Sequence, residues 1–578
     1  MSIYDELFNC DLAGDEEVMK CYTADFETTT DPADCRVWAW GVYSIDDDAF
    51  ITYGNQIGTF VEWMALVGRA KIYFHNLGFD GAFLMDYLLK NGWLHSDNSK
   101  YTSDRTFTAF ISDMNQVYSI KMWFDRNSYV EIQDSLKIIP MSVAAMAKAY
   151  GLEIRKGSID YEEYRAPDHE LTEEEIEYLK NDVEIAAKSL SVYLNQGLTK
   201  MTAGSNALYD YKKMCGGHKK FRYVYPLLDE KQDAFLRKAY RGGFTYVNPK
   251  YQGIDVGEGI VFDVNSLSPS VMAACDGQIL PIYSPVWFDG EPLPDDDYPL
   301  WIALVNVRFE VKKDHIPCLQ LKGNFLFKQT EYIEDSNGVQ SICVTNVDWE
   351  LMNQQYDLYE VEFFGGYKFR GSTHQFKEYV DKWTEVKNNA TLEGNYGIRS
   401  VAKLMLNSLY GKFATRMEVR GRYPVIDDND VLRYIDAEPE TRDPVYLPVG
   451  IFITSYARYK TITSAQSVYD RFVYADTDSL HLIGTDIPEN LDVDPVRLGA
   501  WKHESTFDHG KFLRAKTYVE HEVGADHLTV RVAGLPYRCH EYVTLENFEF
   551  GAKYKGNLTH MRVPGGIVLV DSEKEIRK

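Results

Sequence analysis

The chain has 578 residues, which exceeds the size of a single hydrophobic core and predicts three or more domains. Hydrophobic residues make up 45% of the sequence and aromatic residues 14%, a composition that excludes an intrinsically disordered protein. No apolar run approaches the roughly 20 residues needed to span a bilayer, so we expect no membrane segment. The formal net charge of −26 disfavours a nucleic-acid-binding protein unless basic residues gather locally, as between Lys212 and Arg241.

The eight cysteines are scattered along the chain and form no Cys-x-x-Cys pair. This spacing disfavours a zinc site or a disulfide framework and indicates reduced thiols. The N-terminus, Met1 to Glu6, lacks the basic start and the apolar stretch of a signal peptide. We therefore expect a cytoplasmic protein.

The first predicted element is a strand over residues 21–29 that carries two acids. Asp25 and Glu27 lie two residues apart, so an extended strand places both side chains on one face. Two carboxylates on one face repel each other unless a cation lies between them. The pair alone is a weak signal, because an Asp-x-Glu is more often a solvated strand edge.

Two further acids follow in the N-terminal third. Residues 71–74 form a predicted strand and residues 82–90 a predicted amphipathic helix, which puts Asp80 near a strand–helix junction. Thr172 and Glu175 have the spacing of a capping box. The helix that they open carries Tyr178 and Asp182 four residues apart, on one face.

This pattern of four acids resembles the tyrosine branch of the DEDD exonuclease superfamily. The acids are Asp25, Glu27, Asp80 and Asp182, and Tyr178 lies one helical turn before Asp182. The resemblance implies 3′→5′ exonuclease activity, with two divalent cations on the four acids and Tyr178 orienting the attacking water. It also implies contacts to a single-stranded 3′ end from Thr28, Asn76, Phe79, Ser135, Leu136 and Lys156. Leu136 could equally be a core residue, and Lys156 an ordinary surface lysine.

Two acid-bearing segments frame the rest of the chain. Residues 259–263 form a predicted buried strand that ends in Asp263. Residues 471–483 predict a strand, a tight turn and a second strand, with Asp476 and Asp478 at the turn. An acid pair in a hairpin turn is common, but a pair embedded between apolar strands is not.

Between these segments, residues 399–411 have the pattern of a helix. Lys403, Asn407 and Tyr410 fall on one face of it. An ordinary amphipathic helix with one polar stripe is the alternative. The order along the chain, an acid strand, a basic helix and an acid hairpin, favours a catalytic function.

These three segments resemble motifs A, B and C of family B DNA polymerases. The segments 240–244, 454–458 and 516–518 place the resemblance in the protein-primed branch. The resemblance implies an α/β multidomain fold in which an RNase H-like exonuclease domain precedes a right-hand polymerase with two insertions. The implied bounds are exonuclease 1–202, palm 203–274 and 441–534, first insertion 275–372, fingers 373–414, second insertion 415–440 and thumb 535–578.

The resemblance also implies the chemistry of the second site. Asp263 and Asp478 would ligate two Mg²⁺ ions, replaceable by Mn²⁺, with Asp476 as a weaker or indirect partner and Val264 included in the metal site. The incoming nucleotide would meet Val264, Ser266, Leu267, Ser268, Lys387, Lys403, Asn407 and Tyr410. DNA contacts are implied for Tyr240, Arg241, Gly242, Gly243, Phe244, Thr454, Arg458, Lys516 and Tyr518.

The implied partners are template–primer DNA, deoxynucleoside triphosphates and a terminal protein that primes synthesis, with the chain acting as a monomer or as a heterodimer with that protein. In relatives the two insertions dock the priming protein and encircle DNA, which gives processivity and strand displacement. The implied setting is replication of a linear phage-type genome in the cytoplasm of an infected bacterium.

One position departs from the family pattern. Ser268 stands where relatives have a tyrosine that packs under the deoxyribose and excludes a 2′-hydroxyl. The loss of this aromatic wall predicts weaker discrimination against ribonucleotides. A neighbouring side chain that fills the gap is the alternative.

Two other functions remain open from the residues alone. A dedicated 3′→5′ exonuclease with a DNA-binding C-terminal region would not need Asp263, Asp476 and Asp478, yet all three are present. A non-catalytic replication scaffold would need neither acid set. Primer extension separates the three functions, because extension, degradation alone and no reaction each correspond to one of them.

Overall fold

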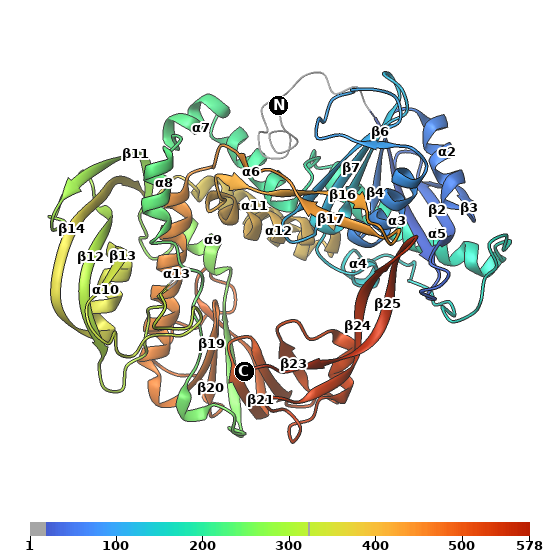
Figure 1. The fold of residues 1–578 in the computed structure, drawn as a ribbon. Helices are drawn as coiled ribbons and strands as arrows, with labels where there is room; N and C mark the ends of the chain where they lie inside the picture. Colours follow the sequence, from blue (N-terminus) through green and yellow to red (C-terminus); the bar gives the residue numbers. More distant parts are fainter. Residues whose placement is uncertain (1–18, 322–323) are drawn as a thin grey trace.

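The computed structural model describes residues 19–321 and 324–578 and builds them around three larger sheets (Figure 1). The segment Met1 to Glu6, for which we expect no signal peptide, lies outside these ranges, as does Cys10. Within the ranges, no helix is both long and apolar enough to cross a membrane. The seven cysteines that they contain are free thiols.

The first sheet has ten strands and organises the N-terminal third. Its strands are β1 (Lys20–Thr28), β2 (Val37–Ser44), β3 (Ala49–Gly54), β4 (Ala70–Phe74), β5 (Leu94–His95), β6 (Thr106–Ser112), β7 (Val117–Trp123) and β8 (Tyr129–Asp134), joined by β16 (Gly421–Ile426) and β17 (Leu432–Asp436). The order is β17-β16-β6-β7-β8-β4-β1-β2-β3, with β5 beside β6. A hairpin from the expected second insertion therefore extends the N-terminal sheet.

Helices cover both faces of this sheet. Successive side chains along β2 point to opposite faces, so neighbouring residues contact different helices. Trp40 packs against Phe60 of α2 (Ile57–Val67), with ring centroids 5.3 Å apart. The next residue, Gly41, faces α5 (Glu173–Leu194), because a Cβ built on it would lie 3.4 Å from Leu179. Asp25 is the cross-strand partner of Gly41, so its side chain also points toward α5.

The helices that carry the predicted acids begin at defined caps. The predicted capping box between Thr172 and Glu175 opens α5. In contrast, α3 (Leu77–Lys90) begins before the predicted start at Ala82. Asn76 adopts the left-handed conformation (φ 74°), and its N–H donates to Asp134 Oδ1 at 3.0 Å, which starts the helix early. Asp80 therefore lies inside the first turns of α3.

The second sheet has seven strands and holds the C-terminal acids. Its strands are β9 (Thr245–Val247), β10 (Gly259–Val264), β19 (Phe472–Asp476), β20 (Ser479–Ile483), β21 (Trp501–Arg514), β22 (Thr517–Glu522) and β23 (Thr529–Val532). The order is β23-β22-β21-β10-β20-β19-β9. Asp263 at the end of β10 is opposite Ser479, so the predicted acid strand and acid hairpin meet at one edge.

A helical layer connects the two sheets. It contains α4 (Val143–Ala149), α6 (Ala203–Met214), α9 (Leu267–Met272), α11 (Lys377–Leu392), α12 (Tyr396–Phe413) and α13 (Leu447–Ser467). One continuous hydrophobic core joins residues of α4 and α5 to residues of α6, α11, α12 and α13. The helix that carries Lys403 is therefore anchored on helices of the N-terminal domain as well as on α6, α11 and α13.

The third sheet lies within the expected first insertion. Its order is β11 (Leu280–Asp289), β14 (Tyr356–Ser372), β12 (Leu300–Val311) and β13 (Gln340–Thr345), and α10 (Asn346–Gln355) follows β13. Figure 1 shows this sheet beside α13, on the far side of the molecule from the N-terminal domain.

A long C-terminal hairpin reaches back to the N-terminal domain. It consists of β24 (Lys553–Val563) and β25 (Gly566–Glu575), and its tip lies at α3 (Figure 1). A Cβ on Gly565 would come within 2.1 Å of the Cys35 carbonyl oxygen, and a Cβ on Gly566 within 2.4 Å of Phe83. A side chain at either position would clash with these atoms, so only glycine permits the approach. The backbone of Gly565 gives a second reason, since its φ of +96° is a conformation that residues with a side chain rarely adopt.

Candidate catalytic sites

The four predicted N-terminal acids gather between β1, α3 and α5. Carboxylate oxygens of Asp25, Glu27 and Asp182 all lie within 4.8 Å of one another, the one such cluster in the described ranges. Asp80 is 4% exposed and adds its charge beside Asp25. Period-two spacing on β1 and the position of Asp182 on α5 produce this cluster, as the sequence predicts.

The electrostatics of this cluster fit a site for hard cations. Burial and the neighbouring Asp182 raise the pKa of Asp25 to about 7. Burial also raises the pKa of Glu27 and of Asp80, with nearby carboxylates adding to the shift. Carboxylates crowded in this way are stabilised when divalent cations replace their protons.

Lys156 and two tyrosines complete this first site. Lys156 Nζ forms an ion pair with Asp182 and lies over the Tyr178 ring at 5.3 Å. The Tyr178 hydroxyl shares a hydrogen bond of 2.7 Å with the Tyr161 hydroxyl. Tyr161 is absent from the sequence-based set, because it lies in an irregular loop where no periodicity marks it.

The other residues predicted at the single-stranded end have mixed environments. Ser135 is 1% exposed, and its hydroxyl donates to the Phe74 carbonyl at 3.0 Å, which argues against a side-chain contact to DNA. Phe79 lies at the N-terminus of α3, 6.0 Å from the His560 ring of the C-terminal hairpin. Of the remaining members, Thr28 ends β1, Asn76 is the N-cap residue of α3, and Leu136 lies in the short 3-10 helix Ser135–Lys137 that follows β8.

The second site centres on Asp263 and Asp478. Burial, Asp478 and Glu504 raise the pKa of Asp263 to about 7, and burial raises the pKa of Asp478. The Val264 N–H donates to the Asp478 carbonyl at 2.8 Å, which joins the end of β10 to the hairpin turn. The two acids that carry the predicted chemistry are therefore neighbours.

Asp476 has a different environment from the other two acids. Its carboxylate accepts hydrogen bonds from Lys516 Nζ at 2.9 Å and from the Thr245 hydroxyl at 3.0 Å. Because its carboxylate is already paired within the protein, Asp476 fits the weaker role predicted for it.

An open cavity of about 580 Å³ lies beside these acids. Its lining includes both acids of the hairpin turn together with Lys516, Tyr518 and Arg531. Tyr518 is stacked on Phe512, with ring centroids 5.3 Å apart. The predicted primer contacts Lys516 and Tyr518 therefore face the catalytic turn.

Three cations gather where the nucleotide is predicted to bind. Burial, together with Arg399 and Lys403, lowers the pKa of Lys387. Lys403 and Asn407 are exposed on α12, and Tyr410 is half-buried on the same side. The positive charge of Lys403 lowers the pKa of Asp263 and so acts against the effect of burial. Lys403 on α12 therefore faces Asp263 on β10. Arg399 is a member that the sequence-based set misses, although it lies one turn from Lys403.

The segment after Asp263 makes a tight turn into α9. Ser266 adopts the left-handed conformation (φ 55°), Leu267 is buried, and Ser268 is half-buried in the first turn of the helix. Ser268 is therefore near the end of β10, where the predicted sugar contact requires it.

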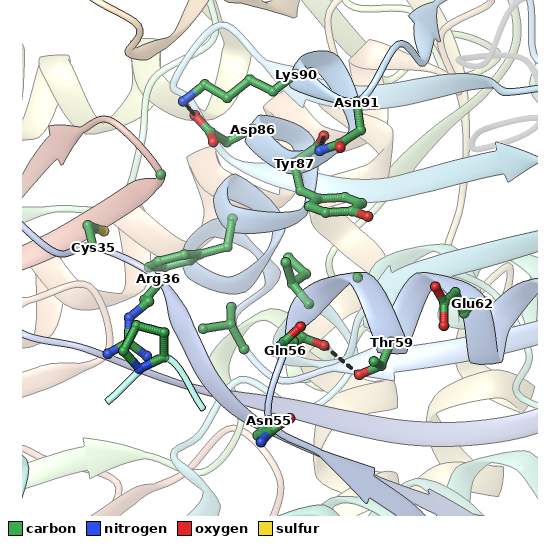
Figure 2. A pocket seen from close by; sticks show the side chains of 16 residues that line it. Cys35, Arg36, Asn55, Gln56, Thr59, Glu62, Asp86, Tyr87, Lys90 and Asn91 are labelled. Atoms are coloured by element: carbon green, nitrogen blue, oxygen red, sulfur yellow. Dashed lines mark hydrogen bonds and ion pairs between the residues drawn. The ribbon is translucent and has the colours of Figure 1, made fainter. Parts of the chain in front are cut away.

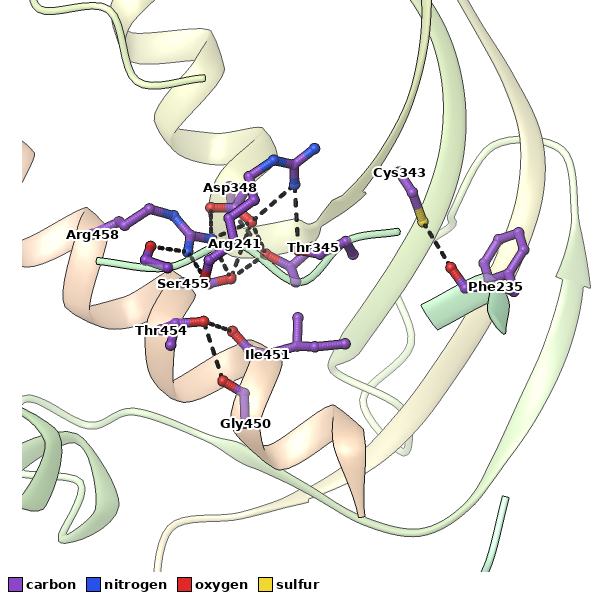
Figure 3. Close-up of polar contacts among 12 residues, drawn as sticks. Phe235, Arg241, Cys343, Thr345, Asp348, Gly450, Ile451, Thr454, Ser455 and Arg458 are labelled. Atoms are coloured by element: carbon purple, nitrogen blue, oxygen red, sulfur yellow. Dashed lines mark hydrogen bonds and ion pairs between the residues drawn. The ribbon is translucent and has the colours of Figure 1, made fainter. Parts of the chain in front are cut away.

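Three residues predicted to contact DNA are instead buried: Arg241 and Arg458 in a network around Asp348, and Thr454 on the neighbouring face of α13 (Figure 3). Arg458 is 2% exposed and donates to both Asp348 oxygens at 2.7 and 2.8 Å. Arg241 is 7% exposed, 3.9 Å from the same carboxylate. Thr454 donates to carbonyls of its own helix, α13. This burial argues against direct DNA contacts by Arg241, Thr454 and Arg458.

The network supports the segment 240–244 and, through it, the catalytic turn. Arg458 donates to the carbonyls of Arg241 and Gly242 at 2.7 and 2.9 Å. A Cβ on Gly243 would lie 2.7 Å from the Thr477 side chain, and the Phe244 carbonyl accepts the Thr477 N–H at 2.6 Å. Phe244 is fully buried, whereas Tyr240 is half-buried near Tyr410. The segment therefore positions the turn between Asp476 and Asp478.

The basic stretch from Lys212 to Arg241 does not form one exposed surface. Arg222 donates to the Pro444 and Val445 carbonyls, and Arg237 forms an ion pair with Asp233 at 2.8 Å. With Arg241 also buried, the arginines of this stretch are used inside the protein.

A separate cavity of about 570 Å³ has a lining that contains no acid of either site (Figure 2). It is lined by α2, α3, the β1–β2 connection and Gly565 at the tip of the C-terminal hairpin. The ion pair between Lys90 and Asp86, at 2.9 Å, lies in its wall. None of the predicted site residues lines it.

Comparisons with known proteins agree with the two sites. The family model described as DNA polymerase type B, organellar and viral, matches residues 68–166 and 161–494. The DNA polymerase of Bacillus phage phi29 is 43% identical over 96% of this chain and 99% of its own length. The DNA polymerase of Streptococcus phage Cp-1 is 33% identical over 97% of this chain and 99% of its own length. The solved structure of phi29 DNA polymerase with primer–template DNA and incoming nucleotide substrates covers 97% of this chain and 100% of its own, with a TM-score of 0.91 at 42% identity.

These findings confirm the predicted α/β multidomain fold with an exonuclease-type domain and a right-hand polymerase. They rule out the two alternative functions, a dedicated exonuclease and a non-catalytic replication scaffold. The chain belongs to the type B DNA polymerases of organelles and viruses, in the protein-primed branch that includes the phi29 enzyme, and it is a DNA-directed DNA polymerase that uses divalent metal and binds DNA.

Proposed function

We propose that this polymerase is a proofreading enzyme with Mg²⁺ at both acid sites, primed by a terminal protein. The observation that carries the proofreading activity is the cluster of Asp25, Glu27 and Asp182 within 4.8 Å, with Asp80 beside it. Buried acids with raised pKa values cluster at catalytic sites, and this set is separate from the acids of the polymerase site.

The residues of the polymerase site have distinct roles in nucleotide transfer. Asp263 and Asp478, together with Val264 at the end of β10, would hold Mg²⁺ or Mn²⁺ here. When bound, the metal would lower the pKa of the primer 3′-hydroxyl and neutralise charge on the triphosphate. Lys387 and Lys403 present positive charge to the phosphates, with Arg399 beside them.

Other residues position the reactants. Tyr410 and Asn407 lie on the same side of α12 as Lys403, where the sugar and base of the incoming nucleotide would meet them. The segment from Ser266 to Ser268 lies below the sugar. Lys516 and Tyr518 line the cavity beside the catalytic turn, which accommodates the primer end. Catalysis by this arrangement is mainly positioning and charge stabilisation.

The exonuclease site holds a frayed primer end for hydrolysis. Tyr178, linked to Tyr161 at 2.7 Å, orients the attacking water next to the four acids. Lys156, held by Asp182, adds positive charge for the scissile phosphate. Thr28, Asn76, Phe79 and Leu136 surround the single-stranded end from neighbouring elements.

We assign the domains as the family pattern implies. The N-terminal sheet forms the exonuclease domain, the seven-stranded sheet the palm, α11 and α12 the fingers, and the C-terminal hairpin the thumb. The sheet with β11 to β14 forms the first insertion, which faces the priming protein. The hairpin β16–β17 forms the second insertion and supports processive, strand-displacing synthesis. The setting is the replication of a linear phage-type genome inside an infected bacterium.

Primer extension tests the two activities separately. The wild-type enzyme should extend a primer when nucleotides are present and degrade it when they are absent. Asp25→Ala should abolish degradation and keep extension, and Asp478→Ala should do the reverse. Asp428→Ala, at an exposed position of the β16–β17 turn, serves as the matched acid control and should keep both activities. Loss of both activities in Asp25→Ala, with a normal melting temperature, contradicts two separate sites.

Protein priming has its own test. The enzyme should attach a deoxynucleotide covalently to a candidate terminal protein from the same genome, in a reaction that needs Asp478. Extension of DNA primers without any such attachment would leave the polymerase activity in place and refute protein priming by that candidate.

A further inference from the structure

A buried pair of a histidine and a glutamate lies within the seven-stranded sheet. His481 of β20 is 2% exposed and Glu520 of β22 is 3% exposed. The two atoms His481 Nδ1 and Glu520 Oε1 are 2.6 Å apart. Because an ionised carboxylate can only accept, Nδ1 donates this hydrogen bond. None of the roles given above to the two acid sites uses the pair.

The pair reaches across two intervening strands. The sheet order places β10 and β21 between β20 and β22. His481 lies opposite Val261 of β10, and Glu520 lies opposite Gly510 of β21. Gly510 has no side chain, which leaves room over β21 for the Glu520 carboxylate to reach the imidazole. The pair therefore joins β20, which follows the catalytic turn, to β22, which carries Tyr518.

His481 is also one of four rings that pack together next to the predicted primer contact. Its ring centroid lies 5.1 Å from those of Tyr474 and Tyr518 and 5.5 Å from that of Phe512. The rings of Tyr474 and Tyr518 contact each other at 5.0 Å. The imidazole, itself held by Glu520, therefore supports both tyrosine rings.

The two tyrosines connect this ring cluster to the cavity beside the catalytic turn. The Tyr474 hydroxyl accepts the Lys516 N–H at 2.9 Å, and Lys516 Nζ pairs with Asp476 at 2.9 Å. Tyr518 and Lys516 both line the cavity of about 580 Å³. The orientation of both predicted primer contacts therefore depends on the rings that surround His481.

Stability alone does not explain a polar pair at this position. The second ring nitrogen of His481, Nε2, is buried and has no hydrogen-bond partner in residues 19–321 and 324–578. An unpaired buried polar atom is unfavourable, and apolar residues of similar volume often replace a buried ion pair without loss of stability. Apolar residues cannot reproduce the direction of a hydrogen bond, which fixes how the imidazole faces its neighbours.

We propose that His481, oriented by Glu520, is a positioning residue for the primer terminus: it holds the rings of Tyr474 and Tyr518 in the orientation that grips the primer. The proposal rests on the primer-binding role of Lys516 and Tyr518 given under the proposed function. It assigns part of the affinity for the primer to a buried pair that does not itself touch DNA.

A double variant, His481→Leu with Glu520→Leu, separates positioning from stability. It should melt at about the same temperature as the wild type or higher, since an apolar pair removes the unpaired nitrogen and the desolvation penalty. Its Kd for primer–template DNA, measured by fluorescence anisotropy in EDTA, should rise about two- to tenfold, the value of one net hydrogen bond to the primer. The Kd for single-stranded DNA and the exonuclease rate on it should stay unchanged.

Two further variants keep the test decisive. Glu520→Gln retains an oxygen that accepts from His481, so its Kd for primer–template DNA should stay within about twofold of the wild type. Val519→Ala is the matched control, because Val519 is fully buried between Tyr518 and Glu520 on β22 and packs into a different hydrophobic cluster. This control should lower the melting temperature and leave the Kd for primer–template DNA unchanged.

An unchanged Kd for primer–template DNA in the double variant overturns the proposal, whatever its melting temperature. A rise of the same size in Glu520→Gln or in Val519→Ala also overturns it, since lost charge or general loosening of the sheet would then be the cause. A double variant that melts below Val519→Ala overturns it as well, because the pair would then serve stability. Failure of the proposed function looks different, since Tyr518→Ala would then leave the Kd for primer–template DNA unchanged.

Discussion

The buried ion pair between Asp348 and Arg458 gives the sharpest stability prediction. Its side chains are 6% and 3% exposed, and two hydrogen bonds of 2.7 and 2.8 Å join them. Burial alone would raise the pKa of Asp348, but the charges of Arg458 and Arg241 hold this pKa below its usual value. Asp348→Ala therefore leaves two buried guanidinium groups without their carboxylate. We expect a loss of about 3–5 kcal/mol in the free energy of unfolding.

Urea unfolding followed by tryptophan fluorescence measures this loss. Asp348→Asn keeps the size and some of the hydrogen bonds, so it should lose less than Asp348→Ala. A double variant, Asp348→Leu with Arg458→Met, should recover part of the stability lost in Asp348→Ala, because it removes one of the two uncompensated guanidinium groups and leaves only Arg241 buried without a carboxylate. The reasoning is refuted if Asp348→Ala loses less than about 1 kcal/mol or if the double variant is the least stable of the set.

The pair should also affect catalysis through the catalytic turn. Arg458 holds the carbonyls of Arg241 and Gly242, and the adjacent Phe244 carbonyl holds the Thr477 N–H. Loss of Asp348 should therefore lower the incorporation rate at a temperature where the variant is still folded, and exonuclease activity on single-stranded DNA should persist. Equal loss of both activities would indicate general unfolding instead.

Three further predictions concern single residues. Ser268→Tyr should raise the ratio of deoxynucleotide to ribonucleotide incorporation by at least about tenfold, since an aromatic wall excludes the 2′-hydroxyl; an unchanged ratio means that another side chain already fills the gap. Glu27→Gln should abolish the exonuclease activity and raise the melting temperature in EDTA by about 2 °C. Burial and nearby acids raise the pKa of Glu27, so its charge is unfavourable when no metal is bound. A lower melting temperature of the variant in EDTA would contradict this electrostatic account. Burial raises the pKa of Glu175, but hydrogen bonds from Arg165 and from the helix cap outweigh burial and lower this pKa from 4.5 to about 2. Glu175→Gln should therefore lower the free energy of unfolding by roughly 2–3 kcal/mol at pH 7. This stabilisation is present above pH 4.5 and is lost as the pH falls toward 2, so the difference from wild type in thermal unfolding should shrink between pH 5 and 3; a constant difference would exclude ionisation as its cause.

Local patterns predict the acid sites well. Period-two alternation places Asp25 and Glu27 on one face, and the capping box at Thr172 sets the register that brings Asp182 to them. The hairpin turn at Asp476 and Asp478 follows from its flanking apolar strands. In each case the information lies within a few neighbouring residues, which is why the sequence suffices.

Contacts between distant segments explain what the sequence does not predict. The start of α3 depends on Asp134, which accepts the Asn76 N–H from 58 residues away. The burial of Arg458 depends on Asp348, which lies 110 residues before it. Nothing near Arg458 in the sequence distinguishes a buried arginine from one that binds phosphate. The DNA contact that the family resemblance implies for Arg458 stays a prediction, and the burial of this side chain argues against it.

The attachment of β16 to β6 has a consequence for solubility. β6 is almost entirely buried and rich in apolar and β-branched residues, and β16 pairs with its end through Ile111 and Ser112. Removing the β16–β17 hairpin would leave the end of this apolar strand, at Ile111 and Ser112, with open hydrogen-bonding groups at the border of the ten-stranded sheet. Such borders invite pairing with other chains and aggregation. A variant without this hairpin should therefore self-associate, so its replication defects have to be measured on the monomeric fraction.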